Sequence, residues 1–132
     1  MDDRELLELA ARAAAVPAYW SVDGTLQNRP MFVVKAGGKM GTMPYESEWN
    51  PLKDDAEALR MAVKLCMGVI HNDPRGQRLY VSADASRFVD PIFEAFTATE
   101  EFDTEDDRPA ATRRAIVRAA AGIARQESSH DS

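Results

Sequence analysis

Two adjacent arginines, Arg113 and Arg114, are the residues whose type and position best suit the binding of an anion. In a predicted C-terminal helix, Arg113 falls at the edge of the apolar side, whereas Arg114, Arg118 and Arg125 fall on an outer stripe. A guanidinium group at the edge of an apolar face either pairs with a carboxylate or binds an anion. Because many acids precede Arg113, we expect an intramolecular pair, with a carboxylate of residues 103–107 or of the sheet.

Two aromatic residues precede a second predicted helix and suggest a surface for a partner. Tyr45 and Trp49 come just before this helix, and Arg60 lies on its polar stripe. Since Trp, Tyr and Arg contribute most of the binding energy at protein interfaces, we expect these three residues to line a partner-binding site. The alternative for Trp49 is structural, with the ring packed in the core under the first turn of the helix.

The sequence shows no recognisable catalytic or metal-binding constellation. Cys66, His71 and His130 are too few and too scattered for a zinc site, and Cys66 is expected in the core. The glycine-rich stretch 37–42 lacks the spacing and the following helix of a phosphate-binding loop. The acidic run 100–107 lacks the order of a calcium loop and is expected to be solvated. We therefore expect a protein that is not an enzyme and that has no cofactor and no metal.

Composition excludes several classes of partner. The chain has 132 residues, with 16 Lys and Arg against 22 Asp and Glu, which gives a formal net charge of −6. This acidic balance argues against a nucleic-acid or anionic-membrane binder. No apolar run approaches the ~20 residues of a membrane span. The acidic start and the single cysteine predict a cytosolic protein rather than a secreted one.

The hydrophobic pattern predicts one α+β domain over residues 1–126, followed by a frayed tail at 127–132. Three helices are expected, over residues 3–15, from Asp54 to just before Gly68, and over 108–126. Strands are expected at residues 18–22, 31–35, 69–72 and 78–83. Residues 91–97 form either a further short strand, which we favour, or a partly helical connection. Residues 36–50 are expected to be irregular. The fold class is therefore three helices on a small, mainly antiparallel sheet.

The second helix has two apolar arcs, which predicts that it is covered on two sides. One arc contains Ala56, Leu59, Ala62, Val63 and Cys66, and the other contains Ala58, Met61 and Leu65. We expect the first arc to face the core. The second arc is expected to be covered by another helix of the chain or, in the interpretation that we favour, in part by a second copy of the chain. A symmetric homodimer would result, since two-fold dimers are the commonest oligomers.

Three blocks of the sequence resemble a known group of phage proteins. They are DRELLELAARAA at 3–14, WNPLKDDAEALRMAVKL at 49–65 and AATRRAIVRAAAGI at 110–123. In order and wording they are similar to small phage and prophage proteins of the phage ABA sandwich domain family. The resemblance implies an α/β/α-type sandwich, a phage origin and no assigned biochemical activity.

Two functions follow as expectations. The first is a non-enzymatic, phage-encoded binding protein in the host cytoplasm that sequesters a host protein or a ligand, for instance as a host-defence inhibitor. The second is a protein that binds or hydrolyses a nucleotide or another small anionic ligand, with a pocket in which Arg60, Arg113 and Arg114 hold the anionic groups.

Overall fold

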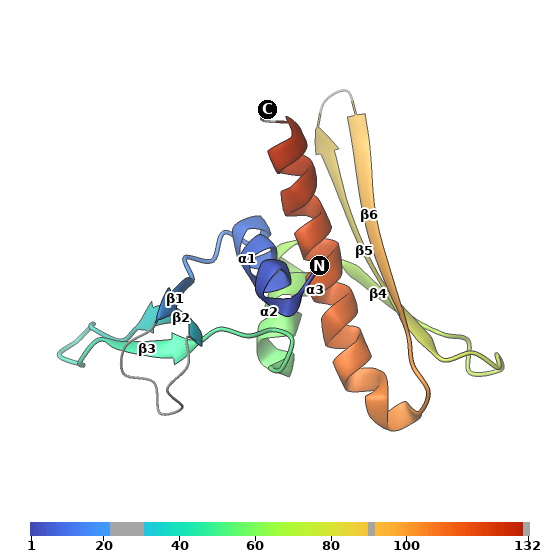
Figure 1. Ribbon diagram of the computed structural model, residues 1–132, viewed down its shortest axis with the longest axis horizontal. Coiled ribbons are helices and arrows are strands. Elements are labelled where there is room, and N and C mark those ends of the chain that lie inside the picture. The colour runs from blue at the N-terminus through green and yellow to red at the C-terminus, as the bar shows by residue number, and fades with distance from the viewer. Residues whose placement is uncertain (22–30, 90–91, 131–132) are drawn as a thin grey trace.

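The C-terminal helix α3 (Arg108–His130) is the central element of the fold. The computed structural model describes residues 1–21, 31–89 and 92–130. Figure 1 shows α3 between the other helices and one of two sheets. The remaining elements are α1 (Asp3–Ala13), β1 (Tyr19–Ser21), β2 (Met31–Ala36), β3 (Tyr45–Glu48), α2 (Asp55–Lys64), β4 (Gly68–His71), β5 (Tyr80–Val89), β6 (Ile92–Glu101) and a 3-10 turn at Glu105–Asp107.

The middle of α3 is buried around almost its whole circumference. Helix α3 contacts the other two helices, α1 and α2, and the strands β5 and β6 of one sheet. Small side chains on α3 allow the neighbouring helices and strands to pack close to it, because the distance between packed elements depends on the side chains at the contact. The buried residues are Ala115, Ile116, Val117, Ala119, Ala120, Ala121, Ile123 and Ala124.

Local capping signals fix the starts of the first two helices as the sequence predicts. The Asp2 carboxylate accepts a hydrogen bond from the Glu5 amide at 2.8 Å and thereby caps α1. The Asp54 carboxylate accepts from the amides of Ala56 at 2.9 Å and Glu57 at 3.4 Å and caps α2. Since each cap satisfies amides that the helix itself leaves unbonded, both predicted starts are confirmed.

The end of α2 differs from the prediction. The helix stops at Lys64, and Cys66 adopts the left-handed conformation with φ of 55°. The Met67 amide then donates to the Ala62 carbonyl at 2.8 Å, which closes the helix with a Schellman-type turn. Gly68 was expected to end the helix but begins β4 instead, and Cys66 is exposed rather than in the core.

The burial of the two apolar arcs of α2 is also the reverse of the prediction. Ala58 and Met61 of the second arc are buried within the chain, so no second copy is needed to cover them. In the first arc Ala62 is buried, but Leu59 and Val63 are 63% and 68% exposed. The observation that led us to expect a homodimer is therefore removed.

The strands form two sheets rather than one. One has the order β1-β2-β3 and the other β4-β5-β6, and all pairs are antiparallel. The hairpin of β4 and β5 is confirmed, and the strand expected at 91–97 is β6 from Ile92 onward. Positions 22 and 91 lie outside the described residues.

Strand β3 lies within the stretch that we expected to be irregular. It is held by polar contacts: Tyr19 and Ser21 of β1 both donate to the Glu46 carboxylate, at 2.6 and 2.7 Å. These hydrogen bonds lower the pKa of Glu46, with that from Tyr19 the larger cause. The hydrophobicity pattern does not indicate this strand, because side-chain hydrogen bonds to Glu46, rather than an apolar face, hold it in place.

The first sheet joins the helices through aromatic side chains. Trp20 donates from Nε1 to the Glu8 carboxylate of α1 at 2.8 Å, and the Arg4 guanidinium lies over its ring at 4.5 Å. On its other side the Trp20 ring contacts Phe32 of β2, with the ring centroids 4.7 Å apart. Figure 1 accordingly shows the helices between two sheets.

This layer order completes the comparison with the predicted architecture. The α+β class with three helices is confirmed, whereas the layer order is not the α/β/α order that the resemblance implied. Helix α3 continues to His130, beyond the predicted end at residue 126, and positions 131–132 of the expected tail lie outside the described residues. Within the described ranges no helix is long and apolar enough to cross a membrane.

Replacement of Ala120 by Leu tests the close packing of α3. Ala120 is fully buried, so the larger side chain has to push a neighbouring element away, and we expect a loss of about 1–3 kcal/mol in the free energy of unfolding. Ala110→Leu, at an exposed position of the same helix, should stay within about 0.5 kcal/mol of the wild type. Urea denaturation measures both, and equal effects would contradict the packing described.

Candidate functional site

Trp49 is a core residue. Its side chain is only 4% exposed, and its ring meets Phe32 edge-on with the centroids 5.8 Å apart. The Trp49 amide also donates to the Phe32 carbonyl at 2.8 Å, which continues the pairing of β2 and β3. The structural alternative for this residue is therefore correct, and Trp49 presents no surface to a partner.

Tyr45 and Arg60 are both on the surface, but in different places. Tyr45 is 60% exposed on β3, and Met40 and Met43 are exposed on the loop that joins β2 to β3. Arg60 is exposed on α2 and pairs with Glu57 of the same helix. Figure 1 shows the β2–β3 hairpin extending away from α2, so the structure does not bring Tyr45 and Arg60 together.

Arg113 forms the intramolecular pair that the sequence predicted, with a different partner. Its NH1 group lies 2.7 Å from the Asp55 carboxylate, and its Nε donates to the Leu52 carbonyl at 2.8 Å. The expected carboxylates were those of residues 103–107 or of the sheet, whereas Asp55 lies in the first turn of α2. The Arg113 side chain is 19% exposed and links α3 to the start of α2.

Arg114 points to another side of α3. Successive residues of a helix are about 100° apart, so Arg113 and Arg114 cannot face the same cavity. The NH1 group of Arg114 lies 3.0 Å from the Asp3 carboxylate of α1, and its Nε lies 3.9 Å from a carboxylate oxygen of Glu100 on β6. The single pocket expected to contain Arg60, Arg113 and Arg114 is therefore not present among the described residues.

An apolar groove lies between α2, β4 and the start of α3. Its volume is about 560 Å³. Apolar side chains dominate its lining because α2 turns the exposed Leu59 toward it, while Val69 and Ile116 approach from β4 and α3. The lining residues are Asp55, Ala58, Leu59, Ala62, Val69, His71, Glu105, Arg108, Pro109, Thr112, Arg113 and Ile116. We call it the apolar groove.

Charged side chains form the rim of the apolar groove. Arg108 donates to the Glu105 carboxylate at 2.7 Å and to the side-chain oxygen Oδ1 of Asn72 at 2.6 Å. Its NH1 also lies 2.9 Å from Nδ1 of His71. The hydrogen bond from Arg108 lowers the pKa of Glu105, because it stabilises the charged form of the carboxylate. The groove thus combines an apolar floor with a fixed pattern of charges.

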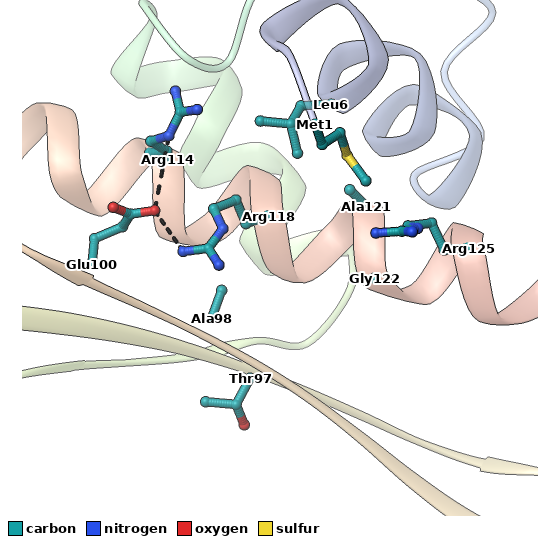
Figure 2. Close-up of a pocket in the computed structure, with 10 residues that line it drawn as sticks. All are labelled: Met1, Leu6, Thr97, Ala98, Glu100, Arg114, Arg118, Ala121, Gly122 and Arg125. Atoms are coloured by element: carbon teal, nitrogen blue, oxygen red, sulfur yellow. Dashed lines mark hydrogen bonds and ion pairs between the residues drawn. The ribbon is translucent and has the colours of Figure 1, made fainter.

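A second cavity, about 410 Å³ in volume, lies between α1, α3 and β6 (Figure 2). Three arginines of α3 line it, and we call it the arginine cleft. Arg118 donates from NH1 to Glu100 at 2.7 Å and to the Thr99 carbonyl at 3.2 Å. The full lining is Met1, Leu6, Thr97, Ala98, Glu100, Arg114, Arg118, Ala121, Gly122 and Arg125.

Sequence reasoning found one of the three arginines of this cleft. Arg114 was a candidate, but Arg118 and Arg125 were assigned to an outer stripe. Helical spacing grouped the three arginines correctly. The strand expected at 91–97 stopped short of Glu100, and its position across the arginines was not predicted. Neither cavity offers a metal site of the usual kind: in the part of the chain that the structure describes, no three His, Cys, Asp or Glu side chains are grouped to hold an ion.

Comparisons with known proteins do not assign these cavities. No family model, no curated protein and no solved structure matches the chain significantly. The resemblance to phage ABA sandwich proteins therefore stays a prediction. The geometry of the apolar groove and of the arginine cleft is the basis for the function proposed below.

Replacement of Arg113 by Ala tests whether its pair is structural. The change removes a largely buried guanidinium and leaves the Leu52 carbonyl without this donor, so we expect a loss of about 1–2 kcal/mol in the free energy of unfolding. Arg60→Ala is the matched control, because an exposed pair within one helix contributes about 0.5 kcal/mol or less. Equal losses in thermal or urea denaturation would show that Arg113 is only another surface arginine.

Proposed function

We propose that this protein is a non-enzymatic binding protein that captures a partner protein in the apolar groove. The single observation that supports this proposal best is the exposure of Leu59 at the edge of an apolar cavity. Val63 lies one turn further along α2 and continues the exposed apolar stripe. Large apolar side chains that stand together on a surface mark sites of interaction with other proteins.

The rim of the groove favours a partner of a particular chemistry. Asp55 and Arg113 stand at one side, and Glu105 and Arg108 stand at another. Such mixed charges steer and orient a partner more than they add affinity, which the apolar floor supplies. The partner that fits is a protein segment with a few large apolar side chains flanked by charges of both signs.

The wider setting of this function follows from the resemblance to phage proteins. On that basis the partner is a host protein met in the host cytoplasm, and capture removes it from its normal role. The net charge of −6 supports a protein rather than a nucleic acid as the partner. The reading as a host-defence inhibitor is the most specific form of this proposal.

A photo-crosslinking amino acid at position 59 tests the proposal directly. In host lysate we expect a crosslinked partner from position 59 and none from position 70. Ile70 is the matched control, because β4 turns Val69 and His71 toward the groove and, by the alternation of a strand, Ile70 to the opposite face. Leu59→Glu should abolish capture of the same partner while the melting temperature is unchanged, since Leu59 is exposed.

The β2–β3 hairpin provides the contrasting result. Tyr45 is exposed there, and it was the sequence-based candidate for the partner surface. If Tyr45→Ala abolishes capture and Leu59→Glu leaves it intact, the partner binds the hairpin and the proposal for the apolar groove is wrong. A crosslink of equal yield from positions 59 and 70 would contradict it as well.

A further inference from the structure

The arginine cleft has a row of guanidinium groups along one face of α3. Arg114, Arg118 and Arg125 are spaced by four and seven residues, which places all three within about 40° of one another around the helix. Strand alternation turns Ala98 and Glu100 of β6 toward this row. Figure 2 shows the three arginines on the face of α3 that borders the cleft, with Glu100 opposite two of them.

Arginines outnumber carboxylates in the lining of this cleft, although the chain as a whole is acidic. The chain carries −6, but the cleft lining holds three arginines and one carboxylate, or +2 (3 − 1). Asp3 approaches Arg114 from α1 and reduces the local sum by one. Two of the three arginines share one oxygen of Glu100, whose side chain is 19% exposed. The one carboxylate of the lining is therefore divided between two guanidinium groups.

Arg118 keeps hydrogen-bond donors for a ligand. Both of its hydrogen bonds, to Glu100 and to the Thr99 carbonyl, come from NH1. Among the described residues its Nε and NH2 groups have no acceptor, although a guanidinium carries five N–H donors in a fork that matches a phosphate. An anion in the cleft would meet these groups without breaking an existing bond.

Gly122 lines the cleft at a position where packing does not require a glycine. Its backbone is not in the left-handed region, and an added Cβ would meet Phe96 at ordinary contact distances, 3.5 Å from Cδ1 and 3.9 Å from Cβ. Glycine inside a helix costs about 1 kcal/mol relative to alanine. Since neither conformation nor crowding demands glycine here, its role fits the close approach of a ligand to the helix backbone.

We propose that the arginine cleft binds a small molecule with two or more linked phosphate groups. The phosphates lie over Ala121 and Gly122, between Arg118 and Arg125, whose Cα atoms are about 10 Å apart along the helix. Arg114 holds the far end of the row, and Glu100 competes with the ligand for Arg114 and Arg118. This site shares no lining residue with the apolar groove, so it stands independently of the proposed function.

Calorimetric titration of the purified protein with pyrophosphate, inorganic triphosphate and ATP tests the proposal. We expect all three to bind, more weakly as salt increases. Arg118→Gln and Arg125→Gln should each weaken binding about tenfold, the loss typical of one charged hydrogen bond. Arg60→Gln, at an exposed position of α2, is the matched control and should not change the affinity. ATP that binds no tighter than triphosphate identifies an oligophosphate site, and tighter binding identifies a nucleotide site.

Two further variants separate a ligand site from a structural ion-pair network. Glu100→Gln removes the competing carboxylate and should strengthen pyrophosphate binding severalfold. Gly122→Ala should raise the melting temperature yet weaken binding, a combination that a purely structural role would not produce. Absence of binding to the wild type and to Glu100→Gln at millimolar ligand would overturn the proposal. Binding that Arg118→Gln, Arg125→Gln and Arg60→Gln reduce equally would overturn it too.

Discussion

The close packing of small side chains around the middle of α3 is the constraint on which the rest of the structure depends. Alanines and a few β-branched residues let α1, α2 and the β4–β6 sheet approach one helix from different sides. A protein of this size has one core, and here that core surrounds a helix instead of lying beneath a sheet. The first sheet is attached further out, through Trp20 and Phe32 against α1.

Both cavities are places where this packing around α3 ends. The apolar groove lies between α2, β4 and the first turns of α3, and the arginine cleft lies between α1, β6 and the stretch of α3 from Arg114 to Arg125. Arg113 and Arg114 illustrate the division, because neighbours in sequence border different cavities. An acidic chain can thus present an apolar surface on one side and a basic cleft on another, with α3 holding both in place.

The local features of the fold were predictable from sequence, and the long-range ones were not. The side chains of Asp2 and Asp54 cap amides two or three residues further along the chain. Such short-range caps can be predicted from the sequence alone. Both arcs of α2 are apolar, and no local signal indicates that Met61 faces inward and Leu59 outward. Strand β3 was missed because Glu46 is held by Tyr19 and Ser21, 27 and 25 residues away.

The candidate sites show the same limit. The core position of Trp49 was the structural alternative that the sequence offered, and it is correct. For Arg113 an intramolecular ion pair was predicted correctly, but its partner Asp55 was not. The arginine row was grouped correctly by helical spacing but placed in solvent, because only the fold brings Glu100 across it. Sequence spacing therefore identifies which side chains share a face of a helix, while the chemistry of that face depends on what lies opposite.

Hydrogen exchange of backbone amides, followed residue by residue by NMR, tests most directly whether α3 is the centre of the fold. If the core surrounds this helix, the amides of residues 115–124 open only when the whole protein unfolds, and their exchange free energy equals the global free energy of unfolding from denaturation. The amides of β1–β3, attached at the periphery, should exchange faster through local opening. Slower exchange in β1–β3 than in the middle of α3 would contradict this account.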